Sequence, residues 1–91
     1  MLLTRDQIDR HLQDLDGWTF VDNAVRKQFT FDGFPRAIDF LNRLAPRAQA
    51  ADHHPDIEIN YKRVTLTYST HSEGGVTAKD VEGAAMADSL A

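Results

Sequence analysis

The chain has 91 residues, a formal net charge of −4 at pH 7, and 10 Lys and Arg against 14 Asp and Glu. This acidic balance argues against the clustered basic surface of a nucleic-acid-binding protein, and the absence of cysteine excludes disulfides and thiolate metal sites. Hydrophobic residues make up 42% of the chain, but no apolar run is long enough to span a bilayer. The first residues, MLLTRDQIDRHL, lack a basic segment followed by an apolar one, so no signal peptide is predicted. We therefore expect one cytoplasmic domain over residues 1–91, with no membrane or nucleic-acid partner.

The first third of the chain predicts a helix and two strands. Thr4 precedes Gln7 by three residues in a capping-box pattern, and the helix that it opens is expected to end near Gly17. The segments WTF and AVRKQFTF follow, separated by the turn signal Asp22-Asn23. The second segment alternates apolar and polar residues, which indicates a strand with one buried face.

The segment FDGFPRAIDFLNRLAPRAQAAD, residues 31–52, predicts the longest helix. Its apolar residues recur with helical spacing, and Pro35 suits the first turn. Pro46 falls inside the pattern, where a proline removes a backbone hydrogen bond and costs about 3 kcal/mol. We expect a kink or two abutting helices there. Phe40 lies off the main apolar stripe and is predicted to suit a helix–helix contact between subunits.

The last third predicts a hairpin and a final helix. Residues 56–71, DIEINYKRVTLTYSTH, alternate in polarity and place His71 in the polar register at the end of a strand. Thr77 and Asp80 form a second capping-box pattern, which opens a helix through about Ala87. The order α-β-β-α-β-β-α predicts an α+β fold: a four-stranded antiparallel sheet with three helices packed on one face.

The pair His53-His54 is notable because the chain has only four histidines. An imidazole gives and takes protons near neutral pH, so two of them at a helix-to-strand junction could act as acid and base on one substrate. His71 is a third candidate, since the intervening hairpin brings strand ends together. A solvated polar turn is the simpler explanation of an isolated pair. A zinc site is a further alternative, although adjacent residues rarely place both imidazoles on one ion.

Two other side chains have structural explanations of their own. Asp80 is the third position of a capping box, where a carboxylate interacts with the helix N-terminus. Trp18 suits the core, although an aromatic ring near a planar ligand can stack on it.

The arrangement of these residues resembles the signature of the pterin-4a-carbinolamine dehydratases. The shared pieces are GW at 17–18, KQFTFDGFPRAIDFL at 27–41, DHHPD at 52–56, TH at 70–71 and GGVTAKD at 74–80. The resemblance implies the same α+β fold and the loss of water from 4a-hydroxytetrahydropterin to give quinonoid dihydropterin, which recycles the cofactor of aromatic amino-acid hydroxylases. It also implies a pterin as the small-molecule substrate, no metal, no cofactor, and a homodimer or homotetramer.

The resemblance implies that His53, His54 and His71 are catalytic. Dehydration needs a proton delivered to the leaving oxygen and one removed from a ring nitrogen, and we expect His53 and His71 to be the main acid–base pair. His54 is expected to bind or orient the ring. The substrate-binding residues that the resemblance implies are Asp52, Ser69, Thr70, Ser72, Asp80 and Trp18.

Two positions depart from the family pattern. The family usually has a charged residue, most often Glu, four positions before the first histidine, whereas this chain has Gln49, which keeps hydrogen bonding but not charge. Pro46 interrupts the helix that leads to the histidines. Two other functions stay open: a non-enzymatic binding or regulatory protein on the same fold, such as a dimerisation cofactor or an assembly chaperone, and a zinc hydrolase that uses the three histidines.

Overall fold

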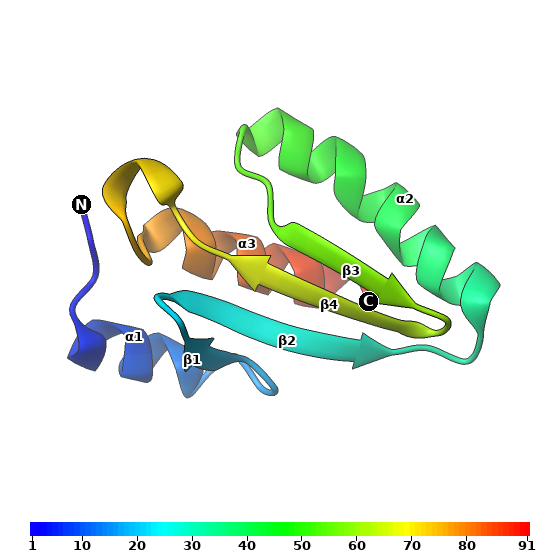
Figure 1. Ribbon diagram of the computed structural model, residues 1–91, viewed down its shortest axis with the longest axis horizontal. Coiled ribbons are helices and arrows are strands. Elements are labelled where there is room, and N and C mark those ends of the chain that lie inside the picture. Colours follow the sequence, from blue (N-terminus) through cyan, green and yellow to red (C-terminus); the bar gives the residue numbers. More distant parts are fainter.

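The computed structural model describes residues 1–91 and confirms the predicted order of elements (Figure 1). The helices are α1 (Arg5–Leu12), α2 (Phe34–Ala51) and α3 (Ala78–Leu90). The strands are β1 (Thr19–Val21), β2 (Ala24–Thr30), β3 (Asp56–Asn60) and β4 (Arg63–Tyr68), and a single 3-10 turn covers His71–Glu73.

The four strands form one antiparallel sheet in the order β1-β2-β4-β3, so β2 and β4 are central and β1 and β3 are the edges. Residues directly opposite one another share a face of the sheet, and Leu66 lies opposite Lys27 on one side and Ile57 on the other. Helices α2 and α3 contact each other, and α1 lies near β1 (Figure 1). The prediction of an α+β fold with a four-stranded antiparallel sheet and three helices is confirmed.

The core fills the space between the helices and the inner face of the sheet. Phe40 of α2 is fully buried there, with its ring centroid 5.0 Å from that of Phe29 and 5.1 Å from that of Phe31. The prediction that Phe40 mediates a contact between subunits is therefore wrong. The buried residues of α2 are Ala37, Phe40, Leu44 and Ala48, so Phe40 belongs to the buried stripe of this helix.

Helices α1 and α2 each differ from the sequence-based expectation. Helix α1 begins with the predicted capping box but ends at Leu12, and turns carry the chain on to Gly17. Helix α2 runs unbroken through Pro46, so the alternative of two abutting helices is wrong. Buried Leu44 and Ala48 anchor the turns on either side of this proline, which itself is exposed. None of the three helices has the length and apolar character needed to cross a membrane.

Candidate active site

A polar cleft of about 520 Å³ opens where α2 passes into β3 and where β4 leads into the 3-10 turn. This volume is typical of small-molecule sites. The cleft is lined by Asp52, His53, His54, Pro55, Asp56, Ser69, Thr70, His71, Ser72 and Lys79. The fold therefore brings together the three predicted histidines and four of the six predicted substrate-binding residues.

The end of α2 sets the direction of the histidine pair. Asp52 closes the helix with a left-handed backbone, at a φ of 51°, which aspartate adopts more readily than most residues with a side chain. The backbone N–H of His53 donates back to the last turn of α2. Pro55 disfavours helical geometry at His54, so the chain passes directly into β3.

A buried carboxylate holds His53 in place. Nε2 of His53 lies 2.5 Å from Oδ1 of Asp80. An ionised carboxylate only accepts hydrogen bonds, so Nε2 carries the proton of this contact, and Nδ1 of the neutral ring is left free to accept one. Asp80 has 0% exposed surface, so it cannot touch a bound molecule. The expectation that Asp80 contacts substrate is therefore corrected: its carboxylate is buried behind His53 and is hydrogen-bonded to that ring.

The second oxygen of the same carboxylate ties the site to α3. Oδ2 of Asp80 accepts hydrogen bonds from Oγ1 of Thr70 and from the backbone N–H of Thr77, both at 2.8 Å. The second of these bonds belongs to the capping box that the sequence predicts for α3. Asp80 therefore caps a helix and orients His53 at the same time.

The other two histidines lie in more exposed surroundings. Nε2 of His54 donates to Oε1 of Gln49 at 2.9 Å, so the residue that departs from the family pattern faces His54 and not His53. His71 does not end a strand, because β4 stops at Tyr68. It begins the 3-10 turn instead, where it is exposed and lines the cleft.

Tyr68 lies behind His53, with the two rings stacked at a centroid distance of 5.9 Å and an interplanar angle of 19°. Its hydroxyl is buried and has no hydrogen-bond partner. Burial, and to a lesser extent the negative charge of Asp80, raises the pKa of Tyr68 to about 12. The only sequence signal for the placement of Tyr68 behind His53 is its position as the last inward-facing residue of β4.

Trp18 does not reach the cleft. It is 4% exposed and its ring packs against that of Tyr68, at a centroid distance of 6.1 Å. Its Nε1–H donates to both carboxylate oxygens of Asp88 at 3.1 Å, and Nζ of Lys27 donates to the same carboxylate at 2.9 Å. The core interpretation of Trp18 is confirmed. The expectation of substrate stacking has no support in this placement, because Tyr68 and not Trp18 contacts His53.

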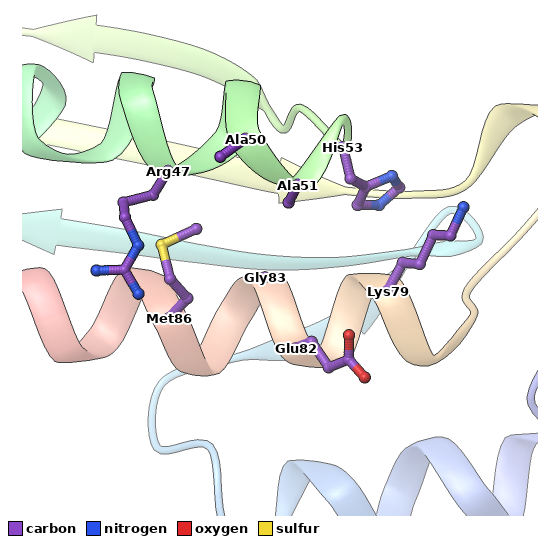
Figure 2. A pocket seen from close by; sticks show the side chains of 8 residues that line it. All are labelled: Arg47, Ala50, Ala51, His53, Lys79, Glu82, Gly83 and Met86. Carbon is purple, nitrogen blue, oxygen red and sulfur yellow. The ribbon is translucent and has the colours of Figure 1, made fainter.

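Lys79 is a lining residue that no pattern in the sequence singles out. It belongs to the first turn of α3, next to Asp80, and Figure 2 shows its side chain extending towards His53. No three side chains of the His, Cys, Asp or Glu type are arranged so that they could hold a metal ion, and the zinc-hydrolase alternative therefore lacks a ligand set.

The sequence of the chain matches, over residues 1–90, a family described as pterin 4 alpha carbinolamine dehydratase. The chain belongs to this family. A relative from Picosynechococcus sp. is 47% identical, over 97% of this chain and 96% of its own length. Another from Mycolicibacterium vanbaalenii is 46% identical, over 98% of this chain and 96% of its own length. Both bear the name "Putative pterin-4-alpha-carbinolamine dehydratase".

The fold of this pterin carbinolamine dehydratase family member is also found in a solved structure. The crystal structure of a transcriptional coactivator/pterin dehydratase from Brucella melitensis superposes with a TM-score of 0.96 at 38% sequence identity. The match covers 100% of this chain and 99% of that one. The family resemblance predicted from the motifs is confirmed.

Proposed function

We propose that this protein is a cytoplasmic hydro-lyase that converts 4a-hydroxytetrahydropterin to quinonoid dihydropterin and water during pterin cofactor recycling. One observation carries the proposal: a chain of this family gathers three histidines in one polar cleft and holds one of them on a buried carboxylate. The polar lining suits a heterocycle rich in hydrogen-bonding groups.

Two imidazoles divide the proton transfers. The free Nδ1 of His53 takes the proton from the ring nitrogen, and Asp80 stabilises the imidazolium that forms, as a carboxylate does in a catalytic triad. Protonated His71 delivers its proton to the leaving hydroxide, which departs as water. Exchange with solvent then returns both histidines to their starting states.

The remaining polar groups are proposed to hold the pterin ring. His54, whose Nε2 is engaged with the neutral amide of Gln49, orients the ring. Asp52, Ser69 and Ser72 are proposed to bind its polar edges. Thr70 donates its hydroxyl proton to Asp80, so we assign it to positioning together with that carboxylate.

Replacing the histidines one at a time tests this proposal. Dehydration of synthetic 4a-hydroxytetrahydropterin, followed spectroscopically, is expected to slow by about 10²- to 10⁴-fold in His53→Ala and in His71→Ala. Asp80→Asn is expected to lower the rate and alter its pH profile, because the negative charge behind His53 is removed. His11→Ala, an exposed position on α1, is the matched control. Full activity in both His53→Ala and His71→Ala contradicts the assignment.

A binding role is the second candidate, because the description of the Brucella melitensis protein also names a transcriptional coactivator. Absence of turnover by the wild-type chain, together with capture of a protein partner that persists in His53→Ala, would favour it over catalysis.

We also propose that the protein forms a homodimer or homotetramer. All five residues of the edge strand β3 are exposed. Ile57 and Ile59 share the inner face of the sheet with Leu66 and Val64, yet they are 47% and 39% exposed. An uncovered edge with apolar side chains is suited to pairing with a second strand.

A further inference from the structure

A second cavity, the α2–α3 groove, lies between these two helices (Figure 2). Its volume is about 380 Å³. Helix α2 contributes Arg47, Ala50 and Ala51, while α3 contributes Lys79, Gly83 and Met86. His53 and Lys79 line both this groove and the polar cleft, so the two cavities are neighbours on either side of the same residues.

The groove differs from the polar cleft in the chemistry of its walls. The cleft has no hydrophobic lining residue, whereas Ala50, Ala51 and Met86 give the groove an apolar surface. Arg47 lies at one end of this surface and Lys79 at the other (Figure 2). Apolar walls with a few charged groups are typical of sites that bind an amphipathic small molecule.

The two cations of the groove have no partner in the protein. None of the ion pairs of the structure includes Arg47 or Lys79, so neither side chain is neutralised. Glu82 is the only carboxylate among the lining residues, and Figure 2 shows it directed away from α2. A groove with unpaired cations, in a chain whose net charge is −4, favours an anionic ligand.

The length of the groove limits what can fill it. Arg47 precedes Ala51, the last residue of α2, by four residues, which corresponds to about 6 Å along the helix axis at 1.5 Å per residue, and His53 lies beyond that end. A ligand that contacts both His53 and Arg47 therefore needs a spacer of several atoms between its ring and its anionic group.

We propose that the α2–α3 groove binds an anionic substituent of the pterin substrate, which extends past His53 to Arg47 while the pterin ring occupies the polar cleft. This inference rests on the proposed function, because it assumes that the ring binds beside the histidines. The substrate class is a pterin whose substituent at carbon 6 has an apolar or aromatic spacer and ends in a carboxylate or phosphate. A short neutral substituent leaves Arg47 without a partner.

Equilibrium binding of three product-like pterins tests the proposal. The probes are 6-methyl-7,8-dihydropterin, which has a short neutral substituent, 7,8-dihydrofolate, which has an aromatic spacer and carboxylates, and 7,8-dihydroneopterin monophosphate, which ends in a phosphate. At least one anionic probe is expected to bind about 5-fold more tightly than the 6-methyl compound, as for one favourable exposed ion pair. Comparing the two anionic probes distinguishes an aromatic substituent that ends in carboxylates from a short hydroxylated substituent that ends in a phosphate.

Variants in the groove give opposite expected effects. Arg47→Gln is expected to weaken binding of the preferred anionic probe by roughly 2- to 5-fold and to leave the 6-methyl compound unchanged. Glu82→Gln is expected to strengthen binding of the same anionic probe, because it removes the only carboxylate of the groove. Arg36→Gln is the matched control, since it makes the same charge change in the same helix about 16 Å away, and it is expected to alter neither affinity.

The outcomes separate this inference from the proposed function. Equal wild-type affinities for neutral and anionic probes, or an Arg47→Gln variant that weakens all probes alike, overturns the groove inference. If the 6-methyl compound still binds in that case, the proposed function stands. Failure of every pterin to bind overturns both.

Discussion

Asp80 and Tyr68 are two buried polar side chains that lie behind His53. They differ in how fully their hydrogen-bonding groups are paired. Asp80 accepts hydrogen bonds from His53, Thr70 and Thr77. The hydroxyl of Tyr68 has no partner at all. A buried hydroxyl without a hydrogen bond lowers the free energy of unfolding by about 1–3 kcal/mol. The buried ring of Tyr68 therefore stabilises the folded state, whereas its hydroxyl destabilises it.

Tyr68→Phe keeps the stacked ring and removes the unpaired hydroxyl. We expect the variant to be at least as stable as wild type at neutral pH, with a gain of up to about 1 kcal/mol in the free energy of unfolding. Unfolding in urea, measured by circular dichroism, checks this expectation. A clear loss of stability at neutral pH would mean that the hydroxyl has a partner in solution.

The same variant has a pH signature. Folding raises the pKa of Tyr68 from 10.0 to about 12, so the folded state favours the neutral phenol. The contribution of this pKa shift to the free energy of unfolding is fully present below pH 10. It is lost as the pH rises through 12, and the total loss is roughly 2–3 kcal/mol. The stability of Tyr68→Phe relative to wild type is therefore expected to increase between pH 10 and pH 12. A difference that stays constant over this range contradicts the assignment.

At the scale of whole elements, α3 contains Gly83 in its interior because the helix packs closely on β4. A Cβ atom at Gly83 would lie 2.5 Å from Cε1 and 2.7 Å from Cζ of Tyr68. Glycine inside a helix is less favourable than alanine by about 1 kcal/mol. The close approach of the two elements explains why it is present here.

Gly83→Ala is therefore expected to destabilise the protein by about 1–3 kcal/mol, opposite to the effect of helix propensity. Combining it with Tyr68→Leu makes room for the new methyl group, so the two changes together are expected to cost less than their sum. Chemical denaturation of the four proteins in this cycle measures the coupling. Additive effects would show that the helix and strand do not meet at this point.

The elements that the sequence predicts well are those specified by neighbouring residues. Both capping boxes form as predicted, because their hydrogen bonds join residues only three positions apart. The orientation of α2 depends instead on which side chains fill the core, and Phe40 is buried against two rings of the β2 region. Packing between distant segments, which a local pattern does not contain, decides such features.

At the scale of the whole molecule, the free edge of β3 is the feature with the clearest consequence for assembly. Ile59→Lys places a charge on the exposed inner face of this edge, which opposes strand pairing. We expect wild type to sediment as a dimer or tetramer and Ile59→Lys to shift towards monomer. Thr19→Lys on β1, the opposite edge of the sheet, is the control and is expected to leave the oligomer intact. A monomeric wild type contradicts the proposed self-association.

Only part of the candidate site was predictable from the sequence. The family motifs pointed to His53, His54 and His71, and all three line one cleft. Lys79 joins them because α3 packs beside the end of α2, and nothing local indicates that contact. Tyr68 likewise reaches the site through contact between distant segments, because its ring in β4 stacks on that of His53.

The carboxylate of Asp80 has a consequence for the dynamics of the site. It holds the first turn of α3 through the Thr77 amide and the ring of His53 through Nε2. Any fluctuation that unwinds this turn therefore also releases the imidazole, so the two events share one opening equilibrium. Solvent exchange of the Thr77 amide proton therefore reports the fraction of molecules in which the histidine has lost its alignment, and it can be measured without substrate.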